Sequence, residues 1–134
     1  MVEHFVLFTL KEDVTDAQYA ELERAIYGLS GLPGCTRLTF GRDHILTRGR
    51  GYTHALMTRH ASRAAAKAYQ LDPEHVRVRD AVIAPLLQRD GAGKPVLLSV
   101  DFEAEVAEPT RWSVLLAGAA LGASAAVVLR KLAN

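Results

Sequence analysis

The chain has 134 residues, which is enough for one compact domain and a short additional segment but not for two independent cores. Sixteen basic residues against fifteen acidic ones leave the net charge near zero, so composition gives no electrostatic argument for a nucleic-acid partner. Cys35 is the only cysteine, which excludes an intramolecular disulfide and a cysteine-based zinc site. We therefore expect a single domain with no cofactor and no metal.

The first half of the chain predicts a strand, a helix and two more strands. Residues 3–10 are largely apolar on both faces of an extended chain, which is typical of an interior strand. Thr15 and Gln18 form a capping-box pattern, and apolar residues then recur at helical spacing until residues 28–31. After a break that contains glycine and proline, two β-rich stretches follow. They are residues 35–41 and 52–60.

The second half predicts two helical segments and a last strand. Ser62 can cap a helix that ends at Tyr69 or Gln70, and Asp72 with Pro73 starts a new helix that Pro85 kinks or interrupts. A turn at residues 88–94 then leads to a strand at residues 95–102. The order of elements is the βαββαβ order of a ferredoxin-like α+β domain, with one extra helical segment.

A four-stranded sheet that carries helices on one face has a second face in need of cover. Val6, Phe8 and Leu98 are predicted to lie on this uncovered face. The simplest cover is a second copy of the chain. We therefore expect a homodimer in which two sheets pack face to face as a dimeric α+β barrel.

Four short stretches occur in chain order before residue 103: HFVLF (residues 4–8), KE (11–12), GYTH (51–54) and YQLDPEHV (69–76). Together they resemble the Dabb family of stress-responsive A/B barrel proteins, over residues 2–102. The resemblance implies a ferredoxin-like protomer that dimerises into an α+β barrel and has a cleft between its sheet and its helices. Asp72 departs from the family pattern, in which histidine is often found at that position.

The resemblance also implies a set of site residues. A plant polyketide cyclase of the family uses a tyrosine and a histidine near the second helix, and these match Tyr69 and His75 as candidate catalytic residues. Two further histidines that line the cleft match His4 and His54 as ligand-binding residues. The implied ligand is a small apolar or polyketide-like molecule. Many members of the family carry similar residues without a known reaction, and packed, hydrogen-bonded side chains are the usual outcome at such positions.

The chemistry that these residues suit is ring closure by intramolecular aldol condensation. The reaction needs a base that removes a proton from an activated methylene and a donor that polarises a carbonyl. A neutral imidazole at His75 fits the first role, and the phenol of Tyr69 fits the second. The hypothesis competes with a purely structural reading, in which His75 satisfies a turn and Tyr69 packs between helices.

Two other kinds of site are not favoured by the sequence. The histidines His4, His54, His60 and His75 are spread over separate elements, with no pair at the spacing of a zinc-protease helix. Basic residues gather around the segment that follows the second strand, but no aromatic residues alternate with them as in single-stranded nucleic-acid sites. We therefore expect a solvated basic loop there.

The composition changes after the last predicted strand. Residues 103–111 form an acidic linker that follows a domain over residues 1–102, and residues 112–129 contain no charge. Eighteen helical residues span about 27 Å, close to the ~30 Å hydrocarbon thickness of a bilayer. Basic residues on both sides of the segment suit two membrane interfaces. A hydrophobic helix over residues 112–131 is therefore predicted as a membrane tail anchor.

Gly118 and Gly122 form a small-xxx-small pair that lets two such helices pack closely. The anchor predicts a location at a mitochondrial, plastid or peroxisomal membrane, with the N-terminal domain in the cytosol, stroma or matrix. The many alanines and glycines also permit a helix that docks on protein, in which case the chain is soluble and cytoplasmic. Three functions stay open: a ligand-binding protein or polyketide cyclase-like enzyme, a non-catalytic stress-response dimer, and a subunit of a membrane assembly.

Overall fold

The computed structural model of the chain describes residues 1–105, of which Met1–Ala104 form a compact unit. The predicted helix at residues 112–131, with Gly118 and Gly122, lies outside the described residues. Within residues 1–105, no helix has both the length and the apolar character that a membrane span requires.

The described residues form a four-stranded antiparallel sheet. Its strands are β1 (Val2–Phe8), β2 (Cys35–Arg42), β3 (His54–His60) and β4 (Leu97–Glu103), and they lie side by side in the order β2-β3-β1-β4. The first and last strands along the chain are therefore neighbours, and β2 and β4 are the two edges. This is the ferredoxin-like arrangement that the order of elements predicted.

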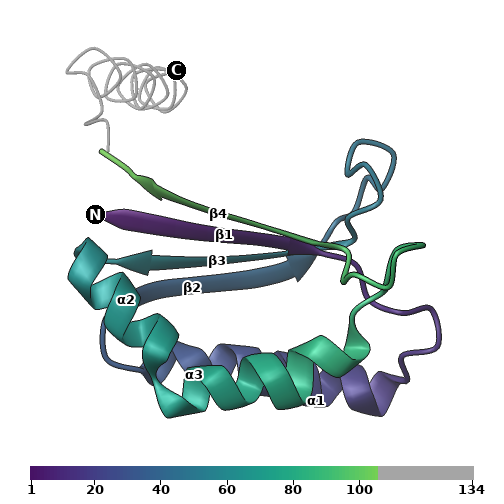
Figure 1. Cartoon of the computed structure of the whole chain (residues 1–134), viewed down its shortest axis with the longest axis horizontal. Coiled ribbons are helices and arrows are strands. Elements are labelled where there is room, and N and C mark those ends of the chain that lie inside the picture. The colour runs from purple at the N-terminus through teal and green to yellow at the C-terminus, as the bar shows by residue number, and fades with distance from the viewer. Residues whose placement is uncertain (106–134) are drawn as a thin grey trace, which may run out of the picture. The chain divides into compact units, whose positions relative to one another are not determined.

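Helices cover one face of this sheet (Figure 1). The helical elements are α1 (Asp16–Gly28), the short η1 (Leu29–Gly31), α2 (Arg63–Leu71), α3 (Pro73–Arg77), η2 (Val78–Ile83) and η3 (Ala84–Leu86). The capping box at the start of α1 is present, because the Thr15 side chain accepts from the Gln18 backbone while the Gln18 side chain accepts from the Thr15 backbone N–H. Ser62 caps α2 through one bond, its side chain accepting from the Ala65 N–H.

The predicted interruption near Pro85 is found, and it extends over two turns. α3 ends at Arg77, η2 continues as a π-helix, and η3 is a 3₁₀ turn that contains Pro85. Proline has no N–H to donate, so the last turns cannot complete the α-helical pattern of hydrogen bonds. Val78 and Ile83 of this interrupted segment are buried against the rest of the core.

The core lies between the sheet and the helices. Phe8 is only 1% exposed and packs in one cluster with residues of the helices and of β3. The prediction that Val6 and Phe8 lie on the uncovered face is therefore wrong: Phe8 belongs to this core and Val6 packs against it. Both faces of β1 are apolar. The alternation of residues therefore shows which side chains share a face, but it does not show which of the two faces meets the helices.

The opposite face of the sheet carries a second set of apolar side chains. On β4, Leu98, Val100 and Phe102 are 44%, 47% and 45% exposed, and only Leu98 had been predicted here. Phe5 on β1 stacks on Phe102 with ring centroids 5.9 Å apart. At one end of this face Arg59 forms an ion pair with the buried carboxylate of Glu3. We call the set of Phe5, Leu7, Met57, Leu98, Val100 and Phe102 the open face.

Candidate functional site

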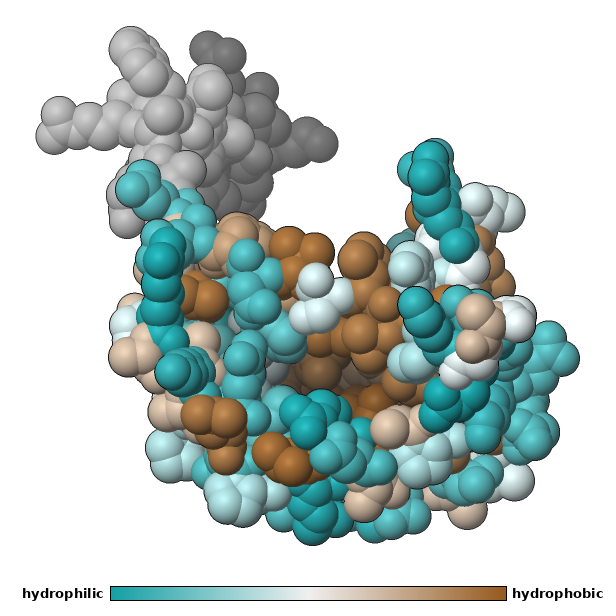
Figure 2. Space-filling view, viewed as in Figure 1, coloured by the Kyte–Doolittle hydropathy of each residue, from teal (hydrophilic) through white to brown (hydrophobic). Residues whose placement is uncertain are grey.

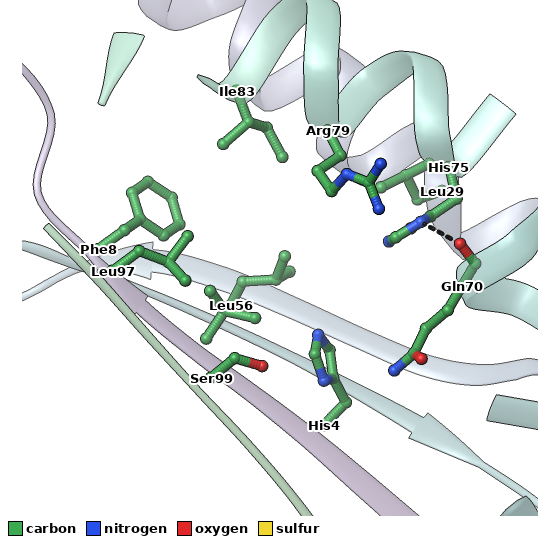
Figure 3. Close-up of a pocket in the computed structure, with 11 residues that line it drawn as sticks. His4, Phe8, Leu29, Leu56, Gln70, His75, Arg79, Ile83, Leu97 and Ser99 are labelled. Atoms are coloured by element: carbon green, nitrogen blue, oxygen red, sulfur yellow. Dashed lines mark hydrogen bonds between the residues drawn. The ribbon is translucent and has the colours of Figure 1, made fainter. Parts of the chain in front are cut away.

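A cavity of about 250 Å³ lies between the sheet and the helices (Figure 2). β1 and β4 form one wall, and the segment from α2 to η2 forms the wall opposite (Figure 3). All seven residues of β4 are exposed, so the cavity opens beside this edge strand. The side chains that line it are His4, Val6, Phe8, Leu29, Leu56, Gln70, His75, Arg79, Ile83, Leu97 and Ser99.

The cavity has an apolar end and a polar end. Phe8, Ile83 and Leu97 gather at one end, and the side chains of His75 and Arg79 point inward at the other (Figure 3). An apolar pocket with a few convergent polar groups is the usual form of a small-molecule site. A cavity of about 150 Å³ is enough to hold benzene, so this one has room for a substituted aromatic ring or a short acyl chain.

His75 reaches the cavity from α3, directly after the Asp72 cap and Pro73. Its Nδ1 lies 3.1 Å from the Gln70 carbonyl oxygen, which can only accept, so Nδ1 carries the proton and Nε2 keeps a lone pair. Burial, and secondarily the positive charge of Arg79, lower the pKa of His75 although the hydrogen bond to Gln70 acts in the opposite direction. The imidazole is therefore neutral near pH 7 and presents a basic nitrogen.

His4 reaches the cavity from β1, opposite His75. Its Nδ1 lies 2.8 Å from a carboxylate oxygen of Asp101, the residue that pairs with it on β4. A carboxylate accepts and does not donate, so the proton sits on Nδ1 and Nε2 is left for the cavity. A carboxylate that holds an imidazole in one tautomer is the arrangement that orients histidines in many catalytic sites.

Three residues of the polar end were not predicted from the sequence: Gln70, Arg79 and Ser99. Arg79 lies one helical turn after His75, and Ser99 lies two residues before the carboxylate that orients His4. The signal that would have found them is spacing, since residues four apart on a helix and two apart on a strand share a face. Arg79 also forms a bidentate pair with Asp80, which fixes its guanidinium at 2.7 and 2.9 Å.

Tyr69 is placed beside His75 but not on the cavity wall. It is 1% exposed, and its ring lies between those of His60 and His75, with centroids 4.8 Å away on each side. Its hydroxyl has no hydrogen-bond partner within residues 1–105. Burial, and then the proximity of Cys35 and Asp72, raise the pKa of the phenol. Tyr69 contacts the site through its ring, which packs against His75 at an angle of 51° between the two ring planes.

His54 lies apart from His4 and His75. Its ring sits among Phe8, Phe40 and Tyr19 at centroid distances of 5.6 to 5.9 Å, and it does not line the cavity. Burial and the charge of Arg42 lower its pKa. The structure therefore brings together two of the four predicted site residues at the cavity and places Tyr69 behind one of them.

No group of three potential metal ligands occurs among residues 1–105. The carboxylate nearest to the cavity histidines, Asp101, is hydrogen-bonded to His4. What the site offers is two imidazole nitrogens, one guanidinium and an apolar recess. This combination can bind a polar head and an apolar body, and it can move a proton.

Comparison with known proteins gives one family. Residues 2–104 match the profile described as "Stress responsive A/B Barrel Domain". This match covers the sheet, the helices and every residue of the cavity.

Three similar proteins illustrate the relationship. Two are stress-response A/B barrel domain-containing proteins of Arabidopsis thaliana: DABB1, which is 36% identical over 81 residues, and a second protein that is 26% identical over 86 residues. These matches cover 58% and 64% of this chain, but only 39% and 33% of the relatives' own length. A dimeric ferredoxin-like protein of unknown function from Thermobifida fusca is 27% identical, with a TM-score of 0.62 over 77% of this chain and 90% of that one.

Proposed function

Because the chain belongs to the stress-responsive A/B barrel (Dabb) family, we propose that it is a homodimeric module that binds a small, largely apolar ligand in the cavity between its sheet and its helices. The observation that carries this proposal is the polarity of the cavity, which has its hydrogen-bonding groups at one end and aliphatic and aromatic groups at the other. A ligand with one ring or short chain and one carbonyl, hydroxyl or carboxyl group fits both ends.

Each polar group suggests a contact for such a ligand. The free Nε2 of His75 accepts a hydrogen bond, so it suits a hydroxyl or an enol, and the Asp101-bound imidazole of His4 lies on the opposite wall. Arg79 donates, so it suits a carbonyl or carboxylate oxygen. The apolar end then contributes through the area that the ligand removes from water.

The binding proposal is tested by filling the cavity from the side of β4. Ser99→Leu adds an aliphatic side chain to the cavity wall on a strand that is exposed throughout, so the fold should tolerate it. Binding of short-chain alkyl phenols and aromatic carboxylic acids, measured by calorimetry, should weaken at least about tenfold, a loss of about 1.4 kcal/mol. Ser99→Ala is the matched control, which removes the hydroxyl without filling the cavity, and it should keep more of the wild-type affinity than Ser99→Leu does. Equal affinity for Ser99→Leu and Ser99→Ala would show that the ligand sits elsewhere.

A second candidate function is intramolecular aldol closure of a linear poly-β-carbonyl compound. The observation that favours it is a neutral His75 whose Nε2 faces a cavity that also holds a fixed cation. In this reaction His75 removes a proton from an activated methylene, the carbanion attacks a carbonyl carbon, and the imidazolium returns the proton to the alkoxide. Arg79 stabilises the developing negative oxygen, and Tyr69 supports the His75 ring through a tilted aromatic contact.

His75→Asn tests this second function while it keeps a polar side chain at the position. General base catalysis typically contributes between about 10² and 10⁴ in rate, so cyclisation of linear poly-β-ketone substrates should fall by that factor. Product formation is followed by mass spectrometry and chromatography. A wild-type protein that binds these compounds but does not convert them would leave the binding function in place and remove the enzymatic one.

The dimer proposal rests on the open face. Leu98, Val100 and Phe102 expose an apolar patch on the sheet, and patches of this kind usually mark an interaction surface. The dimeric relative from Thermobifida fusca supports a second copy as the cover. Light scattering should give twice the protomer mass, and Val100→Glu should reduce it to one protomer. The matched control is Ser99→Ala, one residue away on the opposite face of β4.

Membrane tethering through residues 112–129 is a further part of the proposed function, and it rests on the sequence alone. The uncharged stretch with basic flanks is what supports it. The full-length chain should sediment with membranes, whereas a chain that ends at residue 105 should stay in the supernatant. Full-length protein that is wholly in the supernatant without detergent would rule the anchor out.

A further inference from the structure

The connection between β2 and β3, residues 43–53, projects from one end of the sheet and away from the helices (Figure 1). In the space-filling view, hydrophobic and hydrophilic side chains lie side by side on this projection (Figure 2). The proposed ligand site does not include it, because the residues that line the cavity come from β1, β3, β4 and the helical layer. The projecting loop is thus a separate surface of the molecule.

The loop carries an exposed apolar pair. Ile45 and Leu46 are adjacent, and they are 43% and 50% exposed. Turns usually contain polar residues and glycine, so two exposed large aliphatic residues at a turn are unusual. Packing within the protomer does not explain these two side chains, since neither belongs to the core cluster.

Two residues of the loop have an unfavourable backbone conformation. Leu46 and Arg50 have φ angles of 59° and 49°, in the left-handed region that side-chain-bearing residues other than asparagine and aspartate rarely adopt. The Asp43 carboxylate fixes the turn by accepting the N–H groups of Ile45 and Leu46 at 3.0 and 3.1 Å. Bulky residues at positions where asparagine or glycine would be less strained indicate that their side chains serve a purpose other than stability.

Two exposed basic residues follow the apolar pair in the loop. Arg48 and Arg50 are both exposed, and neither takes part in the ion pairs found within residues 1–105. Asp43 is the only acidic residue between positions 42 and 54, and its carboxylate is occupied by the two backbone N–H groups. The loop therefore presents two aliphatic side chains next to two uncompensated arginines.

We propose that this loop is a docking site for the surface of an anionic lipid bilayer. Ile45 and Leu46 enter the boundary between headgroups and acyl chains, and Arg48 and Arg50 contact the lipid phosphates. Aliphatic side chains beside basic ones are the combination that interfacial membrane-binding elements use. A single-stranded nucleic acid would instead call for aromatic side chains interleaved with the basic ones, and residues 45–50, which carry these four side chains, contain none; His44 and Tyr52 lie on either side of them.

The strained positions give substitutions that separate binding from folding. Leu46→Asn removes the aliphatic side chain and places at φ 59° a residue that tolerates this conformation. Arg50→Asn does the same for the charge at φ 49°. Both variants should be at least as stable as the wild type in thermal unfolding, so any loss of lipid binding cannot be ascribed to misfolding.

The experiment is co-sedimentation of the full-length protein with vesicles of phosphatidylcholine alone and with vesicles that contain phosphatidylserine. Each lysine or arginine near an anionic surface contributes a factor of about five in partitioning, so Arg50→Asn should lose about fivefold on the anionic vesicles. Leu46→Asn should lose about tenfold, and high salt should reproduce the effect of removing charge. Binding to phosphatidylcholine alone should be equal for all variants, because any contribution from residues 112–129 is unchanged.

Two controls carry matched side chains elsewhere on the surface. Leu71→Asn removes an exposed leucine at the end of α2, and Arg24→Gln removes an exposed arginine on α1. Both should bind anionic vesicles as the wild type does. If the loop variants and the controls lose the same amount, or if none loses any, the docking site is not in the loop.

A second experiment measures whether residue 47 of the loop enters an apolar environment on the vesicle. Thr47→Cys in a Cys35→Ser background carries an environment-sensitive fluorophore between Leu46 and Arg48, and its emission should shift to the blue with phosphatidylserine vesicles only. An unchanged emission overturns the proposal even if the protein binds the vesicles. Loss of the dimer in Leu46→Asn, seen by light scattering, would assign the loop to the second copy, and salt-sensitive binding to RNA without binding to vesicles would assign it to nucleic acid.

Discussion

β1 and β4 are paired along their whole length, but they differ in how far their side chains are buried. On β1, Val2 and Phe8 are buried and the residues between them are at least half-covered, whereas every residue of β4 is exposed. The difference arises because β1 has a strand on both sides and helices on one face, and β4 is an edge strand. The cavity lies where the covered strand meets the exposed one, so the feature that makes β4 poorly packed also makes the site accessible.

The comparison predicts unequal costs for removing an aromatic ring from each strand. Phe8→Ala should lower the free energy of unfolding by about 3–5 kcal/mol, since it leaves a void in the core. Phe102→Ala loses mainly its stacking on Phe5, and should cost no more than about 1.5 kcal/mol in the isolated protomer. Urea denaturation at low protein concentration measures both values. A cost for Phe102→Ala that grows with protein concentration would show that the open face is covered by a second copy.

The covered region should also make stability dependent on pH. Burial lowers the pKa of His54 in the folded chain below its unfolded value of about 6.5, so the unfolded chain takes up a proton that the folded chain resists. Stability should therefore decrease as the pH falls below about 6.5, by at most about 1.4 kcal/mol per pH unit for each such histidine. His75 contributes in the same direction.

His54→Phe isolates this contribution, because phenylalanine keeps an aromatic ring among Phe8, Phe40 and Tyr19. Urea unfolding at about pH 7.5 and about pH 5.5 should give a smaller decrease for the variant than for the wild type. If the two decreases are equal, the acid sensitivity comes from other groups, of which His75 is the first to examine by the same substitution.

The smallest expected effect concerns Tyr69, the most buried of the predicted site residues. Tyr69→Phe removes a hydroxyl that has no partner within residues 1–105, so stability should change by less than about 1 kcal/mol or should rise. Ligand affinity should be unchanged as well, because the hydroxyl does not line the cavity. A marked loss of binding or turnover in Tyr69→Phe would restore the direct role that the family resemblance implied for the phenol.

Much of the fold could be predicted from local patterns. The capping residues Thr15 and Ser62 mark where two helices start, and Asp72 with Pro73 marks the start of the third. These signals act within a few residues of chain, so they depend little on the rest of the molecule. Strand ends were less certain: β3 begins at His54 and not at Tyr52, because residues before it belong to the projecting loop.

The site was predicted in part, and the reason is the range of the interactions. His4 and His75 were found by resemblance, but Asp101, which orients His4, is 97 residues away in the sequence and pairs with it only across the sheet. Arg79 shares the cavity wall with His75 because the two lie one helical turn apart, but only the packing of that helix against the sheet decides that this face meets the cavity. His54, on the same resemblance, lies in an aromatic cluster beyond Phe8.

The sequence by itself determined the family, from four short stretches in chain order. It also determined the order of strands and helices and the residues that begin each helix, because capping groups and apolar spacing act over a few residues. The tertiary structure alone decided which face of β1 meets the helices, which histidines share a cavity, and that β4 is left exposed as its wall. An extended chain with apolar residues on both faces fits either orientation, and only the packing of the helices against one of them selects the outcome.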